Sequence, residues 1–117
     1  METLTVTIPE KAVTIGSSIG LADSFLSRLY GLLGRTGLDP GSGILIRPSS
    51  GVHTMWMRFP IDVVALDKDF RVVKTWRRLP PWRITSVSLR THSVLELAPG
   101  QIDECRIEAG DRLSLSR

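Results

Sequence analysis

Residues His53 to Asp67 read HTMWMRFPIDVVALD and are the strongest indication of the fold. Residues 59–66 form an apolar run with the composition of a strand, and the turn formers that follow lead into a second apolar run over residues 70–76. The pattern predicts a β-hairpin with one carboxylate, Asp62, inside its first strand. A buried carboxylate without partners costs several kcal/mol. Asp62 must therefore either belong to a polar network or face a solvated cleft.

The alternation of side chains along a strand places Asp62 on the same face as apolar residues. Arg58 has the same parity, but it would lie roughly 13 Å away along the strand, so the partner should come from another segment. The candidate partners are Arg35, His53 and the backbone amides of residues 41–43. We interpret Asp62 chiefly as a structural acceptor that ties a loop to the sheet, because buried charges are usually paired and inert.

A second carboxylate, Glu96, also lies in an apolar strand-like run. If the strands that carry Asp62 and Glu96 are neighbours, the two groups could share a proton or a cation, as in general acid–base catalysis. This gives a hydrolase-like alternative in which Asp62 or Glu96 is the general base and His53 or Arg35 stabilises charge. The sequence offers no adjacent nucleophile, Ser–His spacing or metal cluster, so we favour a domain without catalytic activity.

The remaining pattern predicts short strands and one clear helix. Leu4, Val6 and Ile8 alternate with threonines, which is typical of a half-buried strand. Apolar residues at three- and four-residue steps predict an amphipathic helix over residues 21–33. Further elements are expected as strands at 12–15, 44–46, 84–87, 93–97 and 112–115, a turn at 16–18 and a helical turn at 102–105. The fold class is mainly β (α+β): a compact barrel or sandwich of short, mostly antiparallel strands.

Composition places the chain in a broad class. With 117 residues, one cysteine and two distant histidines, we expect one domain over residues 1–117, no internal disulfide, no metal site and no cofactor. No apolar run is long enough to span a bilayer, and the first residues do not resemble a secretory signal, so we expect a cytoplasmic protein. A leader already removed would leave no trace. We also expect a monomer.

The formal net charge of +3 is unevenly distributed, because no acidic residue lies between Asp69 and Glu96. This window interleaves cations with aromatic rings, a composition that suits an anionic surface. The candidate surface residues are Trp76, Arg77, Arg78, Trp82 and Arg83. The density of cations is low for a nucleic-acid arm and no binding motif is present, so nucleic acid is not the expected partner.

A ligand pocket is the other candidate site. Trp56 and the flanking methionines could line a pocket for an apolar or sugar-like ligand, with His53 as its polar anchor, although such a group more often belongs to the core. The candidate ligand-binding residues are His53, Trp56, Arg35 and Arg58.

Several short motifs in order along the chain resemble those of the domain-of-unknown-function family 192, also called UPF0127. They are Gly31-Leu32-Leu33-Gly34-Arg35, Gly43-Ile44-Leu45, Met55-Trp56-Met57, Pro60-Ile61-Asp62, Val94-Leu95-Glu96 and Gly110-Asp111. The resemblance implies a compact β-rich domain with one helix, found mainly in prokaryotes, and it implies no known substrate, cofactor or catalytic residue.

The preferred hypothesis from these observations is a small accessory domain that binds an unknown small molecule or protein partner. The binding cleft would lie near His53, Trp56, Asp62 and Glu96. The alternatives are the hydrolase-like enzyme and an interaction module that presents residues 76–83 to an anionic surface.

Overall fold

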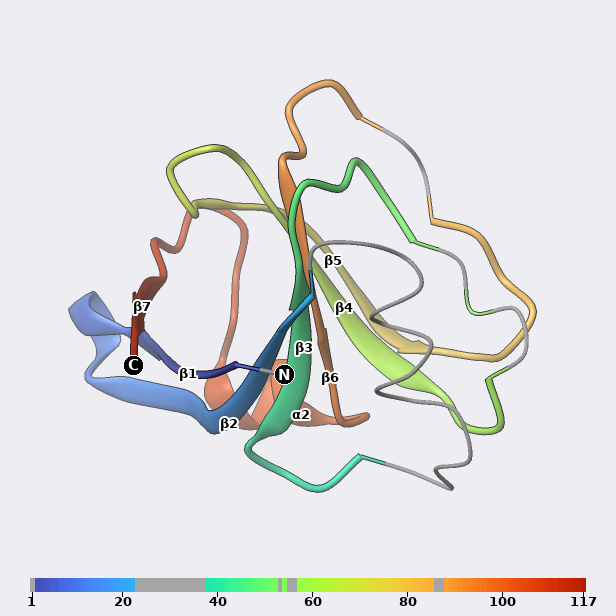
Figure 1. Cartoon of the computed structure of the whole chain (residues 1–117), viewed down its shortest axis with the longest axis horizontal. Helices are drawn as coiled ribbons and strands as arrows, with labels where there is room; N and C mark the ends of the chain where they lie inside the picture. The colour runs from blue at the N-terminus through green and yellow to red at the C-terminus, as the bar shows by residue number, and fades with distance from the viewer. Residues whose placement is uncertain (1, 23–37, 53, 55–56, 86–87) are drawn as a thin grey trace.

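The described strands form one curled sheet of seven strands (Figure 1). The computed structural model describes residues 2–22, 38–52, 54, 57–85 and 88–117. The strands are β1 (Thr3–Ile8), β2 (Val13–Ala22), β3 (Ser42–Ile46), β4 (Ile61–Leu66), β5 (Val72–Leu79), β6 (Ser93–Leu97) and β7 (Ser114–Ser116), in the order β5-β4-β6-β3-β2-β1-β7. β2 and β3 are parallel, and the other pairs among the described strands are antiparallel. The mainly β class with mostly antiparallel strands is confirmed, and the sheet has the shape of a half-barrel.

The N-terminal hairpin consists of β1 and β2, joined by the 3-10 turn η1 (Pro9–Lys11). The alternating residues of β1 are buried, as their spacing predicts. β2 is longer than expected, because the predicted turn at residues 16–18 lies inside it. The pairing of β1 with β2 shifts between Leu4 and Val6. Residues 16–18, which the sequence suggests as a turn, form an irregularity in β2 instead, because a turn and a strand irregularity both accept small residues.

The sequence predicts a helix over residues 21–33, but most of it lies within residues 23–37, which are outside the described part of the chain. Its expected start is wrong. Leu21 and Ala22 are the last residues of β2 and pair in parallel with Leu45 and Ile46 of β3. The backbone pairing with β3 therefore outweighs the helical periodicity at these two positions.

The hairpin predicted around Asp67 is confirmed, since β4 and β5 pair in antiparallel fashion across a turn. One carboxylate oxygen of Asp67 accepts the backbone N–H groups of Asp69 and Arg71, each at 2.9 Å. The hydrogen bond from the Arg71 amide is the main cause that lowers the pKa of Asp67. The strand β4 begins only at Ile61, because Pro60 has no N–H to donate to a ladder.

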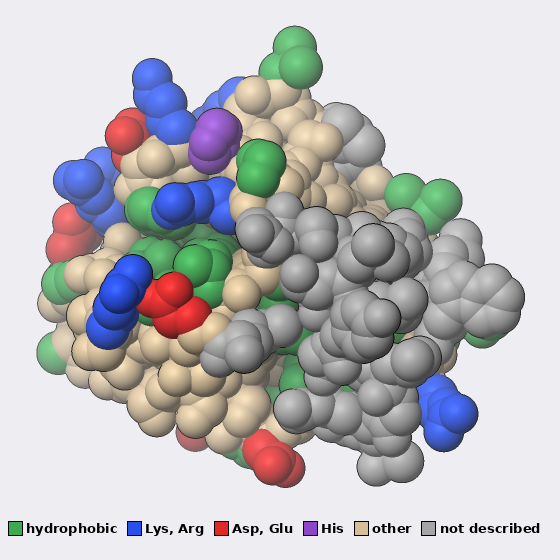
Figure 2. Space-filling view, in the orientation of Figure 1, with side chains coloured by type: hydrophobic (Ala, Val, Ile, Leu, Met, Phe, Trp, Pro, Cys, Tyr) green, Lys and Arg blue, Asp and Glu red, His purple; other side chains and the backbone are tan. Residues whose placement is uncertain are grey.

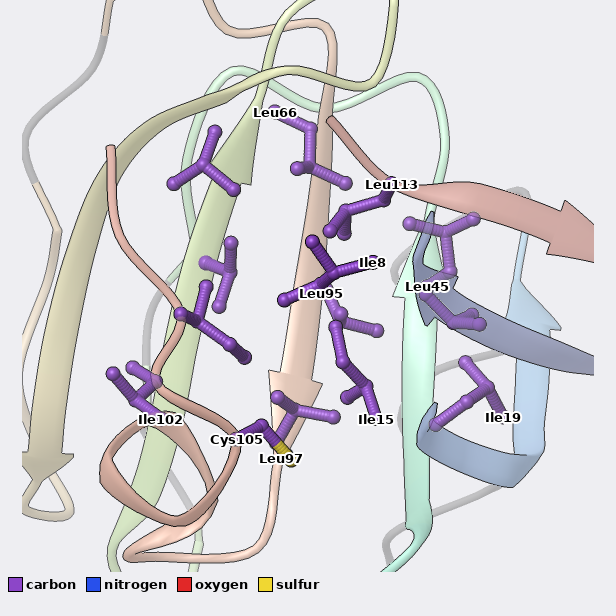
Figure 3. Packing of buried hydrophobic residues seen from close by; sticks show 14 of the residues in the cluster. Ile8, Ile15, Ile19, Leu45, Leu66, Leu95, Leu97, Ile102, Cys105 and Leu113 are labelled. Atoms are coloured by element: carbon purple, nitrogen blue, oxygen red, sulfur yellow. The ribbon is translucent and has the colours of Figure 1, made fainter. Parts of the chain in front are cut away.

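The face of the sheet that carries Asp62 is covered by α2 (Gln101–Cys105), close to the predicted helical turn. Figure 3 shows Ile102 and Cys105 of α2 facing Leu95 and Leu97 of β6, with side chains from β1, β2 and β3 completing this core. A second buried cluster lies on the opposite face of the sheet. It includes Ala22, Leu38, Ile44, Ile46, Phe59, Ile61, Val63, Val94 and Ala98.

The segment after α2 closes one end of the curled sheet. Backbone hydrogen bonds join Val72 to Gly110 and Asp111, and Leu113 to Phe70. The Lys11 ammonium donates to Asp111 at 2.8 Å and lies 3.5 Å from Glu108. The hydrogen bond to Asp111 is the largest of the causes that raise the pKa of Lys11. The start and the end of the described chain are thereby tied together.

Replacing Asp67 by alanine should lower the free energy of unfolding at neutral pH modestly, by about 0.5 kcal/mol, because solvent screens this partly exposed turn. The folded pKa of Asp67 lies below its ordinary value of 3.8. Its contribution is therefore complete above that value and is lost as the pH falls through the folded pKa. Urea titrations at neutral and strongly acidic pH should show the difference between wild type and Asp67→Ala shrinking in acid. A difference that is constant with pH would contradict this account.

Candidate functional site

Asp62 lies opposite an irregularity in β5. The register passes from Ile61 opposite Leu79 to Val63 opposite Trp76, so both Arg77 and Arg78 fall opposite Asp62. An extra residue of this kind leaves a backbone N–H without a partner in the ladder. The N–H of Arg78, which has a φ of 49°, donates instead to Oδ1 of Asp62 at 2.8 Å.

The second oxygen of the same carboxylate caps a helix. Oδ2 of Asp62 accepts the N–H of Ile102 at 2.8 Å, in the first turn of α2. The N-cap residue of α2 is Gly100, which has no side chain to cap with, so the acceptor comes from β4. Asp62 is fully buried and each of its oxygens accepts a backbone N–H. Both donors are amides outside the set of candidate partners that the sequence suggested.

Glu96 points away from Asp62. The strands β4 and β6 are neighbours, with Asp62 opposite Leu97 and Val63 opposite Glu96. Because directly opposed residues share a face and successive residues alternate, the two carboxylates lie on opposite faces of the sheet. Glu96 is fully buried, and the second cluster occupies its face. The arrangement in which the two groups share a proton therefore does not form.

The other predicted ligand-binding residues are only partly described. His53, Trp56 and Arg35 lie outside the described residues, and Arg58 is exposed. The residue between His53 and Trp56 that the structure does describe, Thr54, is fully buried. Thr54 organises the loop that follows β5.

Thr54 holds the loop after β5 through its backbone and its hydroxyl group. Its N–H donates to the carbonyl of Arg83 at 2.7 Å, and its carbonyl accepts the N–H of Trp82 at 3.1 Å. Its hydroxyl donates to the carbonyl of Pro80 at 2.7 Å and accepts the N–H of Arg83 at 2.8 Å. A buried side chain with no charge thus fixes the backbone of residues 80–83.

A second threonine repeats this arrangement one step further along the loop. Thr85 is buried, and its N–H donates to the carbonyl of Val52 at 2.9 Å. Its hydroxyl accepts the N–H of Val52 at 2.9 Å. Sequence reasoning missed both threonines. The only signal available for them was a hydroxyl side chain in an irregular segment, which is too common to predict these hydrogen bonds.

The clamped loop presents hydrophobic side chains to solvent. Among the described residues, the exposed large hydrophobic side chains are Trp82 at 53%, Ile84 at 69% and Leu89 at 105% of full exposure. The neighbouring residues Arg78, Arg83 and Arg90 are exposed as well. We call these six residues the Trp82 surface. Within it, Leu89 and Arg90 line a groove with Asp67 and Asp69, and the Arg78 guanidinium lies near Gly100. In Figure 1 the gold segment after β5 lies at the right of the view and the orange loop before β6 lies at its top, and in Figure 2 hydrophobic side chains project from the outline at separate places.

The five residues predicted for an anionic surface divide into two groups. Arg78, Trp82 and Arg83 belong to the Trp82 surface. Trp76 is half-buried against the second cluster, with the Lys74 ammonium 5.0 Å from its ring centroid. Arg77 pairs with Asp103 of α2, with Nε 2.6 Å from the carboxylate oxygen.

Two open grooves lie on the described surface. One, of about 460 Å³, is lined by Pro9, Glu10, Asp69, Phe70, Arg112, Leu113, Ser114 and Leu115. The other, of about 310 Å³, is lined by Asp67, Lys68, Asp69, Leu89, Arg90 and His92, and thus adjoins the Trp82 surface. In the described part of the chain, no helix combines the length and the hydrophobicity that crossing a membrane requires.

The chain matches a known protein family and is similar in sequence to proteins of other organisms. The model of the family DUF192, "Uncharacterized ACR, COG1430", matches residues 5–115. A UPF0127 protein of Pyrococcus horikoshii is 33% identical over 101 residues, which is 81% of this chain and 84% of the relative.

Two solved structures are similar in fold, each with 22% sequence identity. One is a protein of unknown function from Novosphingobium aromaticivorans, with a TM-score of 0.79 over 96% of this chain and 83% of the other. The second, from Sinorhizobium meliloti, carries the name "putative transcription regulator" and has a TM-score of 0.78 over 97% and 92% of the two chains.

Replacing Asp62 by asparagine should lower the free energy of unfolding by about 1 to 3 kcal/mol, because the amide nitrogen cannot accept one of the two buried N–H groups. Urea denaturation measures this loss. Hydrogen exchange should show faster exchange at the Arg78 or Ile102 amide. Glu104→Gln, an exposed change on α2 with the same loss of charge, is the control and should have little effect. Wild-type stability in Asp62→Asn would show that the carboxylate is dispensable for the fold.

Thr54→Val should lower the free energy of unfolding by about 1 to 3 kcal/mol, because it removes the hydroxyl and leaves the partly buried Arg83 N–H without that acceptor. The valine is close to threonine in shape, so the loss reports on the hydroxyl group. Thr54→Ser keeps the hydroxyl and should retain more of the stability. Thermal unfolding gives the order of the three proteins, and equal losses in both variants would argue against the clamp.

Proposed function

We propose, for a chain that belongs to the uncharacterised DUF192 family, that it is a non-catalytic interaction module which binds a negatively charged partner through the Trp82 surface. The family supplies no activity, so the proposal is drawn from the surface of this chain. Its main support is that the strongly exposed large hydrophobic side chains of the described residues all fall between residues 82 and 89. Scattered apolar side chains are normal on a protein surface, but their concentration on one segment is a feature of interaction sites.

The charge of this segment favours an anionic partner. Arg78, Arg83 and Arg90 are exposed, and the sequence from residue 70 to residue 95 contains no acidic residue. Arg90 lies in the groove with Asp67 and Asp69, so the charge argument rests on Arg78 and Arg83. Arg77 is not part of this argument, because it already pairs with Asp103.

The backbone of the loop suits a preformed contact. Trp82 has a φ of 65°, a conformation that costs a bulky residue energy and persists only where the surroundings impose it. The hydrogen bonds of Thr54 to residues 80, 82 and 83 impose it here. A loop that is fixed before binding loses less entropy when the partner arrives.

The geometry of the two buried carboxylates supports the proposal of a non-catalytic module. Asp62 already accepts two backbone amides, and Glu96 lies on the other face of the sheet, so they do not form an acid–base pair. The cleft near His53 and Trp56 stays a separate prediction, because these residues lie outside the described part of the chain. A cytoplasmic location and a monomeric state are also predictions, which cell fractionation and light scattering can examine.

Retention on immobilised heparin, a general polyanion, tests the proposal. Arg83→Glu should elute at clearly lower salt than the wild type, because reversal of a cation at the contact removes an attraction and adds a repulsion. Arg112→Glu is the matched control, since it changes the net charge equally at an exposed arginine outside the Trp82 surface. If the two variants elute together, binding depends only on net charge and the Trp82 surface has no special role.

A further inference from the structure

We infer that the outer edge of β7 binds an extended, cationic segment of a partner protein, which adds to the sheet as a further strand and lies in the groove between β7 and Phe70. Three features support this site: the direction of the backbone groups at Leu115, the apolar floor of the groove, and the charge at its rim. The groove shares no residue with the Trp82 surface, so this site is independent of the function proposed above.

The backbone of Leu115 points away from β1. Leu113 donates its N–H to the carbonyl of Phe70 at 2.9 Å. The next residue, Ser114, pairs with Thr7 of β1 instead. Because the backbone groups of successive residues in a strand point to alternate edges, Leu115 directs its N–H and its carbonyl to the same side as Leu113. These are the groups that an added strand would pair with.

A groove lies on this side of β7. Residues 70–72 pair with residues 111–113, and the two chains then separate, because residues 67–70 form the turn between β4 and β5. In Figure 1 the red chain that leads into β7 rises to meet this yellow-green turn at the left of the view. The groove of about 460 Å³ is lined by residues of both segments. Since β7 is the last strand in the order, no strand of the described residues lies along this edge.

The floor of the groove is apolar. Phe70 and Leu115 both line it, and both are half-buried against the core that α2 covers. Directly opposed residues of two antiparallel strands place their side chains on the same face. The residue of an added strand opposite Leu115 would therefore project toward Phe70, and an apolar side chain there would remove more of both residues from water.

The charge at the rim favours a cationic segment. Glu10 and Asp69 contribute two exposed carboxylates to the groove, against one guanidinium from Arg112. Residues that flank the apolar position of an added strand point away from the floor, and a lysine side chain is long enough to reach back to the rim. Lysines at these positions would gain attraction to the carboxylates.

The other edge of the sheet is protected against strand addition. The strand β5 has two shifts in its pairing with β4, and it carries the exposed cations Lys74 and Arg77. Irregularities and charges of this kind are the usual means by which edge strands avoid pairing. In β7 the pairing with β1 has no shift, and residues 114–116 carry no charge.

A second copy of this chain fits the edge less well than a peptide segment does. In each copy residues 70–72 already lie beside residues 111–113, so only the short strand β7 could pair between two copies. Such a contact falls far short of the roughly 1,000 Å² that a stable interface buries. An extended segment enters the groove as well, where main-chain hydrogen bonds provide affinity and one side-chain position provides specificity.

An NMR titration of the isotope-labelled protein with short capped peptides tests the inference. The probe has valine at its centre and lysine on each side, and the amide signals of Phe70 and Leu115 should shift when it binds. Methylation of the valine nitrogen removes one N–H donor and keeps the side chain, so it should weaken binding about fivefold. Equal binding of the methylated peptide would overturn strand addition.

Leu115→Pro tests the same hydrogen bond from the side of the protein. It removes an N–H that faces away from β1, a position at which an edge strand accepts proline, and should weaken binding of the probe about fivefold. Leu115→Val keeps the N–H and an apolar side chain, and should bind the probe like the wild type. Circular dichroism checks the fold of both variants, and the methylated peptide tests the inference even if the proline variant does not fold.

The charge of the partner is tested separately. The double variant Glu10→Gln, Asp69→Asn should bind the probe about threefold more weakly, as expected for exposed charge pairs. Glu104→Gln, on the exposed side of α2, is the control and should leave binding unchanged. A peptide with glutamate in place of both lysines should bind much less than the probe. Equal binding of the two peptides would overturn the cationic character of the partner.

Two further outcomes would overturn the inference as a whole. One is the absence of binding by any of the peptides, or signal shifts confined to residues outside the groove. The other is a dimer in light scattering that Leu115→Pro dissociates, because a second copy would then occupy the edge. Neither outcome bears on the heparin experiment, which concerns the Trp82 surface.

Discussion

The fold depends on one carboxylate that accepts two backbone N–H groups which regular secondary structure leaves unpaired. One of these groups lies in the irregularity of β5 at Arg78, and the other lies in the first turn of α2 at Ile102. A neutral apolar side chain at position 62 would fill the space but would leave both amides buried without these acceptors. Asp62 thus links β4, β5 and α2 at one point. This explains how a charge is tolerated in an apolar strand.

The hydrogen bond between Asp62 and Arg78 also affects the path of the surface loop that follows β5. The left-handed backbone at Arg78 redirects the chain at the end of β5, and residues 80–85 then follow a path that Thr54 and Thr85 hold in place. The exposed side chains of the Trp82 surface stand on this path. The interior and the exterior of the molecule are therefore connected, because an acceptor in the core determines where the loop begins and buried hydroxyl groups determine its course.

The local sequence pattern predicts those elements in which the hydrophobic periodicity and the turn residues indicate the same structure. The alternation in β1, the hairpin around Asp67, the strand at 93–97 and the short helix after Pro99 all appear in the structure. Errors occurred where pairing between distant segments decides the conformation. Residues 16–18 resemble a turn and residues 21 and 22 fit a helical period, yet all of them belong to β2, because β1 and β3 supply partners for the backbone.

The candidate site was harder to predict from the sequence than the fold. The chain pattern identified Asp62 and Glu96 as unusual, but only the register between β4 and β6 reveals that the two groups lie on opposite faces. The donors to Asp62 are backbone N–H groups, which every residue except proline possesses, so the residue types at these positions do not predict them. The basic and aromatic window was visible in the sequence. The exposure of Trp82 and the pairing of Arg77 depend on tertiary structure.

The two partners of the hydrogen bond between Asp62 and Ile102 are made at different times during synthesis of the chain. The ribosome adds the residue that carries the acceptor forty residues before it adds the residue that carries the donor. One oxygen of the Asp62 carboxylate therefore gains its amide partner only after Ile102 has been added to the chain.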